Sequence, residues 1–264
     1  MMDELRVTTA RNAGTFLVGE AKKFAECWGG QYVVRGELSL EKLRQQEGVE
    51  KLVVFSVDGP VIEGIGWRYF YHPSMAALRA LQWERNGQDA LVQALALQPG
   101  ETVLDGTLGL GADAVLMSLA VGETGKILGV EKSPWVAMIT SHGLAHAVGL
   151  NPVLEAAMRR IETRCGDALD VLKDMSAGAV DAVYLDPMFR YSVQGSSNMQ
   201  PLHQIADRRP LRRELLQEAC RVARRRVVVK EAVHSPEWER LGIQDFSGGR
   251  YSRVRYGILK GAGI

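Results

Sequence analysis

The sequence lacks the features that mark secreted, membrane and metal-binding proteins. Its 264 residues include three cysteines, Cys27, Cys165 and Cys220, which lie far apart and form no C-x-x-C pair. Neither a disulfide framework nor a thiolate zinc site is therefore expected. No stretch approaches the roughly 20 consecutive apolar residues of a membrane helix, and the start, MMDELRVTTA, has no apolar signal core. We predict a cytoplasmic protein that binds neither membrane nor metal.

Net charge is also small, but it is distributed unevenly. The formal net charge is +1, yet residues 201–264 hold 14 Lys and Arg against 7 Asp and Glu. Two interpretations stay open: a solvated helix face with salt bridges, or a phosphate-binding surface, since arginine forks match phosphate oxygens. The arginines concerned are Arg208, Arg209, Arg212, Arg213, Arg221, Arg224, Arg225 and Arg226.

No internal repeat or low-complexity linker is present, but the pattern changes twice along the chain. Residues 1–72 alternate short strand-like runs with helical stretches and predict a small α/β domain, and residues 73–100 predict a helical connector. From 101 to 264, apolar strands alternate with helices, which is typical of a mostly parallel sheet covered on both faces. Strands are expected at 102–105, 127–131, 161–165, 182–186 and 226–230, with an antiparallel pair around Ser247–Gly249 at the end.

A glycine loop follows the first of these strands, in VLDGTLGLGADA (103–114). Gly109 and Gly111 allow a tight turn and close approach of a ligand, and the spacing also fits the dinucleotide pattern G-x-G-x-x-G/A. Asp105 ends the strand, and its carboxylate would repel a pyrophosphate. S-adenosylmethionine has no phosphate and carries an ammonium and a sulfonium, so Asp105 favours this cofactor over a nicotinamide dinucleotide.

Acids also follow the next two strands. Glu131 is placed to accept hydrogen bonds from both ribose hydroxyls, and Asp167 from an adenine amino group. Asp167 could instead simply cap the next helix. Three acids at the carboxyl ends of three successive strands make the stronger case for a cofactor site, because open α/β sheets bind ligands at that edge.

The fourth strand ends in YLDPMF, which resembles the (D/N)-P-P-(Y/F) motif of enzymes that methylate amines. Asp186 and the Pro187 carbonyl can accept both N–H groups of an exocyclic amine and make its nitrogen more nucleophilic, with proline fixing the carbonyl direction. Phe189 can stack on a flipped base. The alternative is a capping Asp, a Pro turn and a core Phe.

The same region supplies candidate substrate contacts. Met188 and Arg190 flank Phe189, and Lys230 ends the fifth strand, where it could neutralise a phosphate, contact the base or be a plain strand-end lysine. The loop 190–206 is rich in Ser, Gln, Gly and Asn, and we expect it to be mobile without RNA and to close over the substrate.

The segments LDGTLGLGADA, VEKSPWVA, YLDPMF and RRVVVKE together resemble the bacterial small-subunit ribosomal RNA (guanine-N2)-methyltransferases known as RsmJ, over about residues 68–260. The resemblance implies a Rossmann-like class I methyltransferase fold with a seven-stranded, mostly parallel sheet. It implies S-adenosylmethionine contacts at Ala112–Asp113, Glu131–Lys132, Asp167–Ala168 and Asp186. It further implies methylation of guanine N2 in rRNA, either naked or in a ribosomal particle.

Two weaker patterns are given structural interpretations. His142 and His146 are spaced for zinc on a helix, but no metalloprotease Glu and no third ligand accompany them, so a helix-surface location is expected. The aromatic run WRYFYHP (67–73) is expected in the core, with base stacking as the alternative.

Other functions remain open from the sequence. The same tetrad would suit an enzyme that methylates a protein glutamine or a small molecule. A non-catalytic module that binds RNA or a ribosomal partner is a further alternative. The sequence predicts no oligomeric state.

Overall fold

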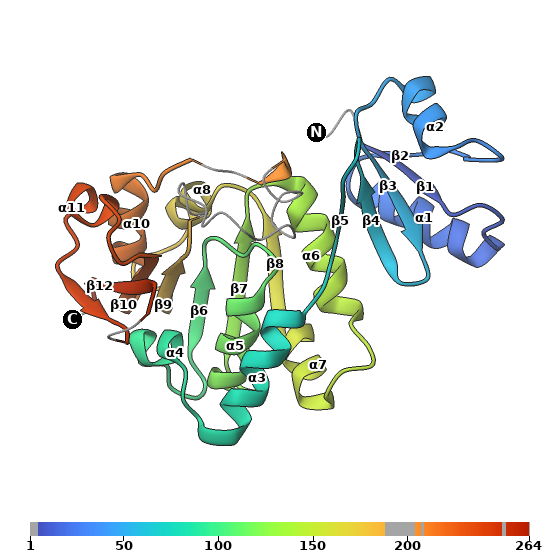
Figure 1. The fold of residues 1–264 in the computed structure, drawn as a ribbon. Coiled ribbons are helices and arrows are strands. Elements are labelled where there is room, and N and C mark those ends of the chain that lie inside the picture. The colour runs from blue at the N-terminus through green and yellow to red at the C-terminus, as the bar shows by residue number, and fades with distance from the viewer. Residues whose placement is uncertain (1–4, 188–203, 207–208, 250–251, 264) are drawn as a thin grey trace.

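The computed structural model describes residues 5–187, 204–206, 209–249 and 252–263, and these residues form two β-sheets (Figure 1). The N-terminal sheet has the order β2-β1-β3-β4-β5, with β1 parallel to β2 and β3, and β4 antiparallel to β3 and β5. Its elements are β1 (Arg6–Thr9), α1 (Thr15–Cys27), β2 (Gln31–Tyr32), α2 (Leu40–Glu47), β3 (Leu52–Ser56), β4 (Gly59–Glu63) and β5 (Arg68–Phe70).

Two helices, α3 (Ser74–Asn86) and α4 (Ala90–Leu95), lead from β5 to the second sheet. Gly87 ends α3 in the left-handed conformation, with φ +64°, as glycine readily does. Asp89 then begins α4, because its carboxylate accepts hydrogen bonds from the backbone N–H groups of Leu91 and Val92. Gly87 and Asp89 therefore determine where α3 ends and where α4 begins.

The second sheet has seven strands in the order β11-β12-β10-β9-β6-β7-β8. The five from β10 to β8 are parallel, and β12 pairs antiparallel with β10 and β11. The predicted fold class, a mostly parallel α/β sheet with an antiparallel C-terminal pair, is confirmed. The strands are β6 (Thr102–Asp105), β7 (Lys126–Glu131), β8 (Ile161–Cys165), β9 (Val180–Leu185), β10 (Ala223–Ala232), β11 (Asp245–Ser247) and β12 (Val254–Lys260).

Helices cover both faces of this sheet, so alternate side chains of one strand enter different cores. Val103 and Tyr184 lie in one apolar cluster, with residues of α3, α4 and α5, whereas Leu104 and Leu185 lie in another, with residues of α8 and α10. Burial on both faces explains the continuous apolar runs of the sequence. The helices are α5 (Ala112–Val121), α6 (Pro134–His146), α7 (Pro152–Arg159), α8 (Ala168–Asp174), α10 (Arg213–Val222) and α11 (Glu237–Leu241).

A third apolar cluster joins the N-terminal unit to α6, and the two lie side by side (Figure 1). His142 of α6 packs edge-on against Phe24 and Phe55, with ring centroids 5.9 and 5.4 Å apart. The expected helix-surface location is therefore wrong for His142, although His146 is exposed. Burial lowers the pKa of His142 to about 4, with a further contribution from His146.

The aromatic run 67–73 is divided between core and surface. Tyr69 is buried in the third cluster, and Trp67 and Tyr71 pack against it, as the core interpretation predicts. Phe70, on the other face of β5, is 44% exposed. Within the part of the chain that the structure describes, no helix is long and apolar enough to cross a membrane.

Candidate active site

The carboxyl ends of β7, β6 and β9 bring three acids to one edge of the sheet. Asp105 is the last residue of β6, Glu131 is the last of β7, and Asp186 directly follows β9. Because these strands are adjacent and parallel, the acids lie side by side, as the sequence predicted. Asp105 is 1% exposed and Glu131 8%, so both are withdrawn from water.

The glycine loop between β6 and α5 has the geometry that its sequence requires. Gly109 and Gly111 have φ values of +53° and +76°, in the left-handed region that favours glycine. The Gly109 N–H donates to Glu131 Oε2 at 3.0 Å, and the Gly109 carbonyl accepts from Thr140 Oγ1 at 2.6 Å. The loop is thus held against β7 and α6, and it delivers Ala112 and Asp113 to the first turn of α5.

Thr107 links two of the acids, a role that sequence reasoning missed. Its backbone N–H donates to Asp105 Oδ1 at 3.0 Å, and its hydroxyl lies 3.4 Å from the same oxygen. The hydroxyl oxygen accepts the backbone N–H of Asp186 at 2.6 Å. Burial, with additional repulsion from Asp113, Asp186 and Glu131, raises the pKa of Asp105 to about 8.

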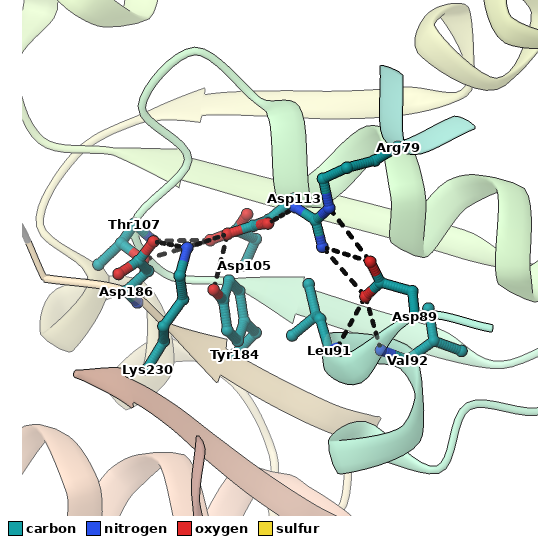
Figure 2. A network of polar contacts seen from close by, with 10 residues as sticks. All are labelled: Arg79, Asp89, Leu91, Val92, Asp105, Thr107, Asp113, Tyr184, Asp186 and Lys230. Atoms are coloured by element: carbon teal, nitrogen blue, oxygen red, sulfur yellow. Dashed lines mark hydrogen bonds and ion pairs between the residues drawn. The ribbon is translucent and has the colours of Figure 1, made fainter. Parts of the chain in front are cut away.

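Lys230 reaches from β10 to two carboxylates (Figure 2). Its ammonium lies 2.7 Å from Asp186 Oδ2 and 3.1 Å from Asp113 Oδ2. The register of β10 against β9 pairs Val229 with Leu185, so Lys230 stands next to Asp186. Burial raises the pKa of Asp186 to about 6 despite the opposing effect of Lys230.

Asp113 is the centre of a wider polar network (Figure 2). It accepts a hydrogen bond from the Tyr184 hydroxyl at 2.7 Å and forms an ion pair with Arg79 of α3. Arg79 also binds both carboxylate oxygens of Asp89, at 3.1 Å. Lys230 and Arg79 overcome the effect of burial and lower the pKa of Asp113 to about 2. Sequence patterns gave no signal for Arg79, which lies 34 residues before its partner.

Asp167 and Lys132 lie at the ends of β8 and β7 and pair with each other. Asp167 also caps α8 by accepting the Leu169 N–H at 3.0 Å, and it contacts Arg212 at 3.3 Å. The capping role considered from the sequence is therefore present. The adjacent Ala168 is 7% exposed and lies against the β6 loop, where a Cβ on Gly106 would meet its Cβ at 3.3 Å.

The predicted substrate contacts near Phe189 fall at and beyond the end of one described segment. Pro187 is described, but Met188, Phe189, Arg190 and the loop as far as residue 203 lie outside the described residues. Their expected roles in stacking, substrate contact and closure stay predictions.

Four arginines of the C-terminal surplus make contacts within the protein. Arg221 binds the Leu172 and Met175 carbonyls, Arg224 pairs with Asp181, Arg225 pairs with Glu101, and Arg226 binds the Ala94 carbonyl. Arg224–Arg226 also lie at the start of β10, where Arg226 pairs with Ala182 near the beginning of β9. They therefore stand at the opposite edge of the sheet from Asp186. The salt-bridge interpretation is thus supported for Arg221, which also pairs with Glu218, and for Arg224 and Arg225, while Arg226 binds a backbone carbonyl.

The charge balance of the site fits a cationic cofactor. Asp105, Asp113, Glu131 and Asp186 face two cations, Lys230 and Arg79, in a largely buried setting. A carboxyl whose pKa is raised to about 8 is stabilised as an anion when a positive charge arrives. The ammonium and sulfonium of S-adenosylmethionine provide such charge, whereas a pyrophosphate would add repulsion. The residues present thus fit this cofactor. Among the described residues there is no group of three His, Cys, Asp or Glu that could hold a metal ion.

Comparison with known proteins supports S-adenosylmethionine as the cofactor. A family model described as "Putative SAM-dependent methyltransferase" matches residues 70–247. Ribosomal RNA small subunit methyltransferase J of Shewanella piezotolerans is 30% identical over 78% of this chain and 75% of its own length. The protein of the same name from Dechloromonas aromatica is 30% identical over 61% of this chain and 65% of its own length.

Two further similarities extend over almost the whole chain. Uncharacterized protein YpiP of Bacillus subtilis is 35% identical over 96% of this chain and 98% of its own length. A solved SAM-dependent methyltransferase from Neisseria gonorrhoeae has the same fold, with a TM-score of 0.66, 19% identity and coverage of 98% and 97% of the two chains. The chain therefore belongs to the SAM-dependent methyltransferase family, has ribosomal RNA small subunit methyltransferase J proteins among its relatives, and uses S-adenosylmethionine as its cofactor.

Proposed function

We propose that the protein transfers a methyl group to the exocyclic N2 amine of a guanine in small-subunit rRNA. The observation that carries the proposal is Asp186, a largely buried acid that precedes Pro187 at the cofactor edge of the sheet and is bound by Lys230. The similarity to proteins named ribosomal RNA small subunit methyltransferase J supports RNA as the substrate class.

The cofactor residues follow from the geometry of the strand ends. Asp105 and Asp113 would face the methionine ammonium, with Gly109, Gly111 and Ala112 giving the backbone close access. Glu131 would accept the ribose hydroxyls beside Lys132. Asp167, with Ala168, would border the adenine. The cofactor supplies an electrophilic methyl group on a sulfonium.

The protein's own part in the reaction is to orient and activate the amine. Lys230 contacts Oδ2 of Asp186, which leaves Oδ1 to accept one N–H of the amine. The Pro187 carbonyl would accept the second N–H, and Phe189 would stack on the base. Two such acceptors increase electron density on a nitrogen whose lone pair is otherwise delocalised into the ring. Holding the reacting atoms about 3 Å apart then removes much of the entropic barrier.

Lys230 acts within this site as a positioning residue. Its ammonium bridges Asp186 and Asp113, so it fixes the direction of the Asp186 carboxylate and favours its ionised form. The pKa of about 6 lets Asp186 stay ionised at neutral pH while remaining basic enough to take the proton released from the amine. A positioning role agrees with the contacts of Lys230 better than binding of an RNA phosphate does, because a phosphate would compete with Asp186 and Asp113 for the ammonium.

The test is transfer of tritiated methyl groups to small subunits, assembly particles and naked rRNA from cells lacking this protein, followed by nucleoside analysis. We expect radioactivity in N2-methylguanosine. Label only in protein would favour methylation of a glutamine. Cofactor binding without transfer to any fraction would favour a non-catalytic RNA-binding module. Either result would overturn the proposal.

A further inference from the structure

Tyr69 is a buried side chain whose hydroxyl has no partner among the described residues. It belongs to β5 of the N-terminal sheet, where the burial pattern alternates, with Arg68 and Phe70 exposed and Tyr69 5% exposed. Its phenolic oxygen makes no hydrogen bond to any described residue. A buried hydroxyl without a partner is costly, so natural proteins rarely retain one without a use for it.

The surroundings of Tyr69 place it at the cofactor side of the domain boundary. Its apolar cluster includes Val136 and Ile139 of α6, and Leu110 packs against the same cluster. Leu110 stands between Gly109 and Gly111, and Val136 donates its backbone N–H to Ser133, two residues after Glu131. Tyr69 therefore belongs to the apolar cluster that also includes the start of α6 and against which the glycine loop packs, and these two segments hold Glu131.

We propose that the Tyr69 hydroxyl donates a hydrogen bond to a ribose oxygen of the bound cofactor, so that the N-terminal unit completes the cofactor site. The inference rests on the proposed binding of the ribose by Glu131. When both ribose hydroxyls donate to a carboxylate, their oxygens still accept hydrogen bonds, and a phenol is a suitable donor.

Electrostatics keep Tyr69 in the donor form. Burial first, and then the negative charge of Glu131, raise the pKa of Tyr69 far above its ordinary value. The neighbouring Tyr71 differs, because burial alone accounts for its raised pKa, and its ring lies against Gly143 in the middle of α6.

This difference provides a matched pair of variants, Tyr69→Phe and Tyr71→Phe. Both remove a buried hydroxyl without a partner among the described residues, so both should leave the melting temperature of the cofactor-free protein unchanged or higher. We expect only Tyr69→Phe to weaken S-adenosylmethionine binding, by roughly tenfold in calorimetry. It should also reduce the rise in melting temperature that the cofactor causes.

Deoxyribose analogues locate the contact. Tyr69→Phe should bind S-adenosylhomocysteine more weakly than wild type does. One of its 2′-deoxy and 3′-deoxy analogues lacks the oxygen that Tyr69 contacts, and for that analogue the two proteins should have equal affinity. Equal affinity of wild type and Tyr69→Phe for S-adenosylmethionine would overturn the inference and leave the proposed function intact. A lower melting temperature with unchanged affinity would show a structural role and would also overturn it. Failure of the wild-type protein to bind S-adenosylmethionine would instead refute the proposed function.

Discussion

The raised pKa of Asp105 predicts an unusual dependence of stability on pH. In the unfolded chain this carboxyl titrates near 4, but in the folded protein it titrates at about 8. Between these values the folded state holds a proton that the unfolded state has lost, so stability falls as pH rises through this window. Asp186 contributes in the same direction only up to about pH 6. A comparison above pH 6.5 therefore isolates Asp105.

The perturbation is Asp105→Asn, which keeps an oxygen that can accept the Thr107 N–H and removes the titrating group. A folded pKa of about 8 makes the wild type lose about 1.7 kcal/mol of unfolding free energy between pH 6.5 and pH 8. The Asn variant should lack this loss. Urea denaturation at several pH values gives the free energy of unfolding of both proteins. Contributions of the other titrating groups cancel in the difference between the two values.

Cofactor binding gives a second measure of the same proton. At pH 7 the cofactor-free carboxyl would be about 0.9 protonated if its pKa is about 8, and an arriving ammonium should ionise it. Calorimetry of S-adenosylmethionine binding in phosphate and in Tris should then show release of up to about one proton. Asp181→Asn is a suitable control for removing a carboxylate. The Thr102 N–H and Arg224 lower the pKa of Asp181, so its titration affects stability only at acid pH. Parallel stability curves for wild type and Asp105→Asn above pH 6.5 would refute the reasoning.

Three other changes test the remaining parts of the site. Asp186→Ala should lower methyl transfer on the order of 100-fold or more while S-adenosylmethionine still binds in calorimetry; near-normal transfer would contradict its role. Lys230→Met should raise the pKa of Asp186 and shift the acid limb of the pH–rate profile to higher pH, with Lys230→Arg restoring it in part; an unmoved limb would exclude the positioning role. His142→Gln should flatten the fall in melting temperature between about pH 6.5 and 4, because the folded state resists protonation of His142 in that window; identical pH curves would contradict this.

The sequence predicted the sheet well because its strands are buried on both faces. The apolar runs at 102–105, 127–131, 161–165 and 182–186 differ from β6 to β9 by at most two residues at an end. Strand β10 is longer than predicted, Ala223–Ala232, because it begins before Arg226 with Ala223, Arg224 and Arg225 and continues past Lys230 to Glu231 and Ala232. A charged strand end of this kind has no apolar pattern to reveal it.

The acids at the strand ends were also predictable, but their partners were not. A parallel sheet brings the carboxyl ends of adjacent strands together whatever the loops do, so Asp105, Glu131 and Asp186 could be grouped from the sequence. The bridge from Lys230 to Asp186 depends on the register of β10 against β9, and the Arg79 contact depends on how α3 packs against α5. Both contacts depend on tertiary packing, which no local sequence pattern reveals.

The network also explains how a buried group of acids can persist before the cofactor binds. Lys230 and Arg79 neutralise Asp113 and part of Asp186, but neither cation contacts Asp105. The raised pKa of Asp105 therefore keeps this carboxyl mostly protonated at neutral pH, and under the proposed cofactor binding an arriving positive charge would ionise it. A dinucleotide cannot supply that charge at the glycine loop, whereas a sulfonium cofactor can. We therefore propose that selectivity for the cofactor depends on Asp105, the acid that neither Lys230 nor Arg79 contacts.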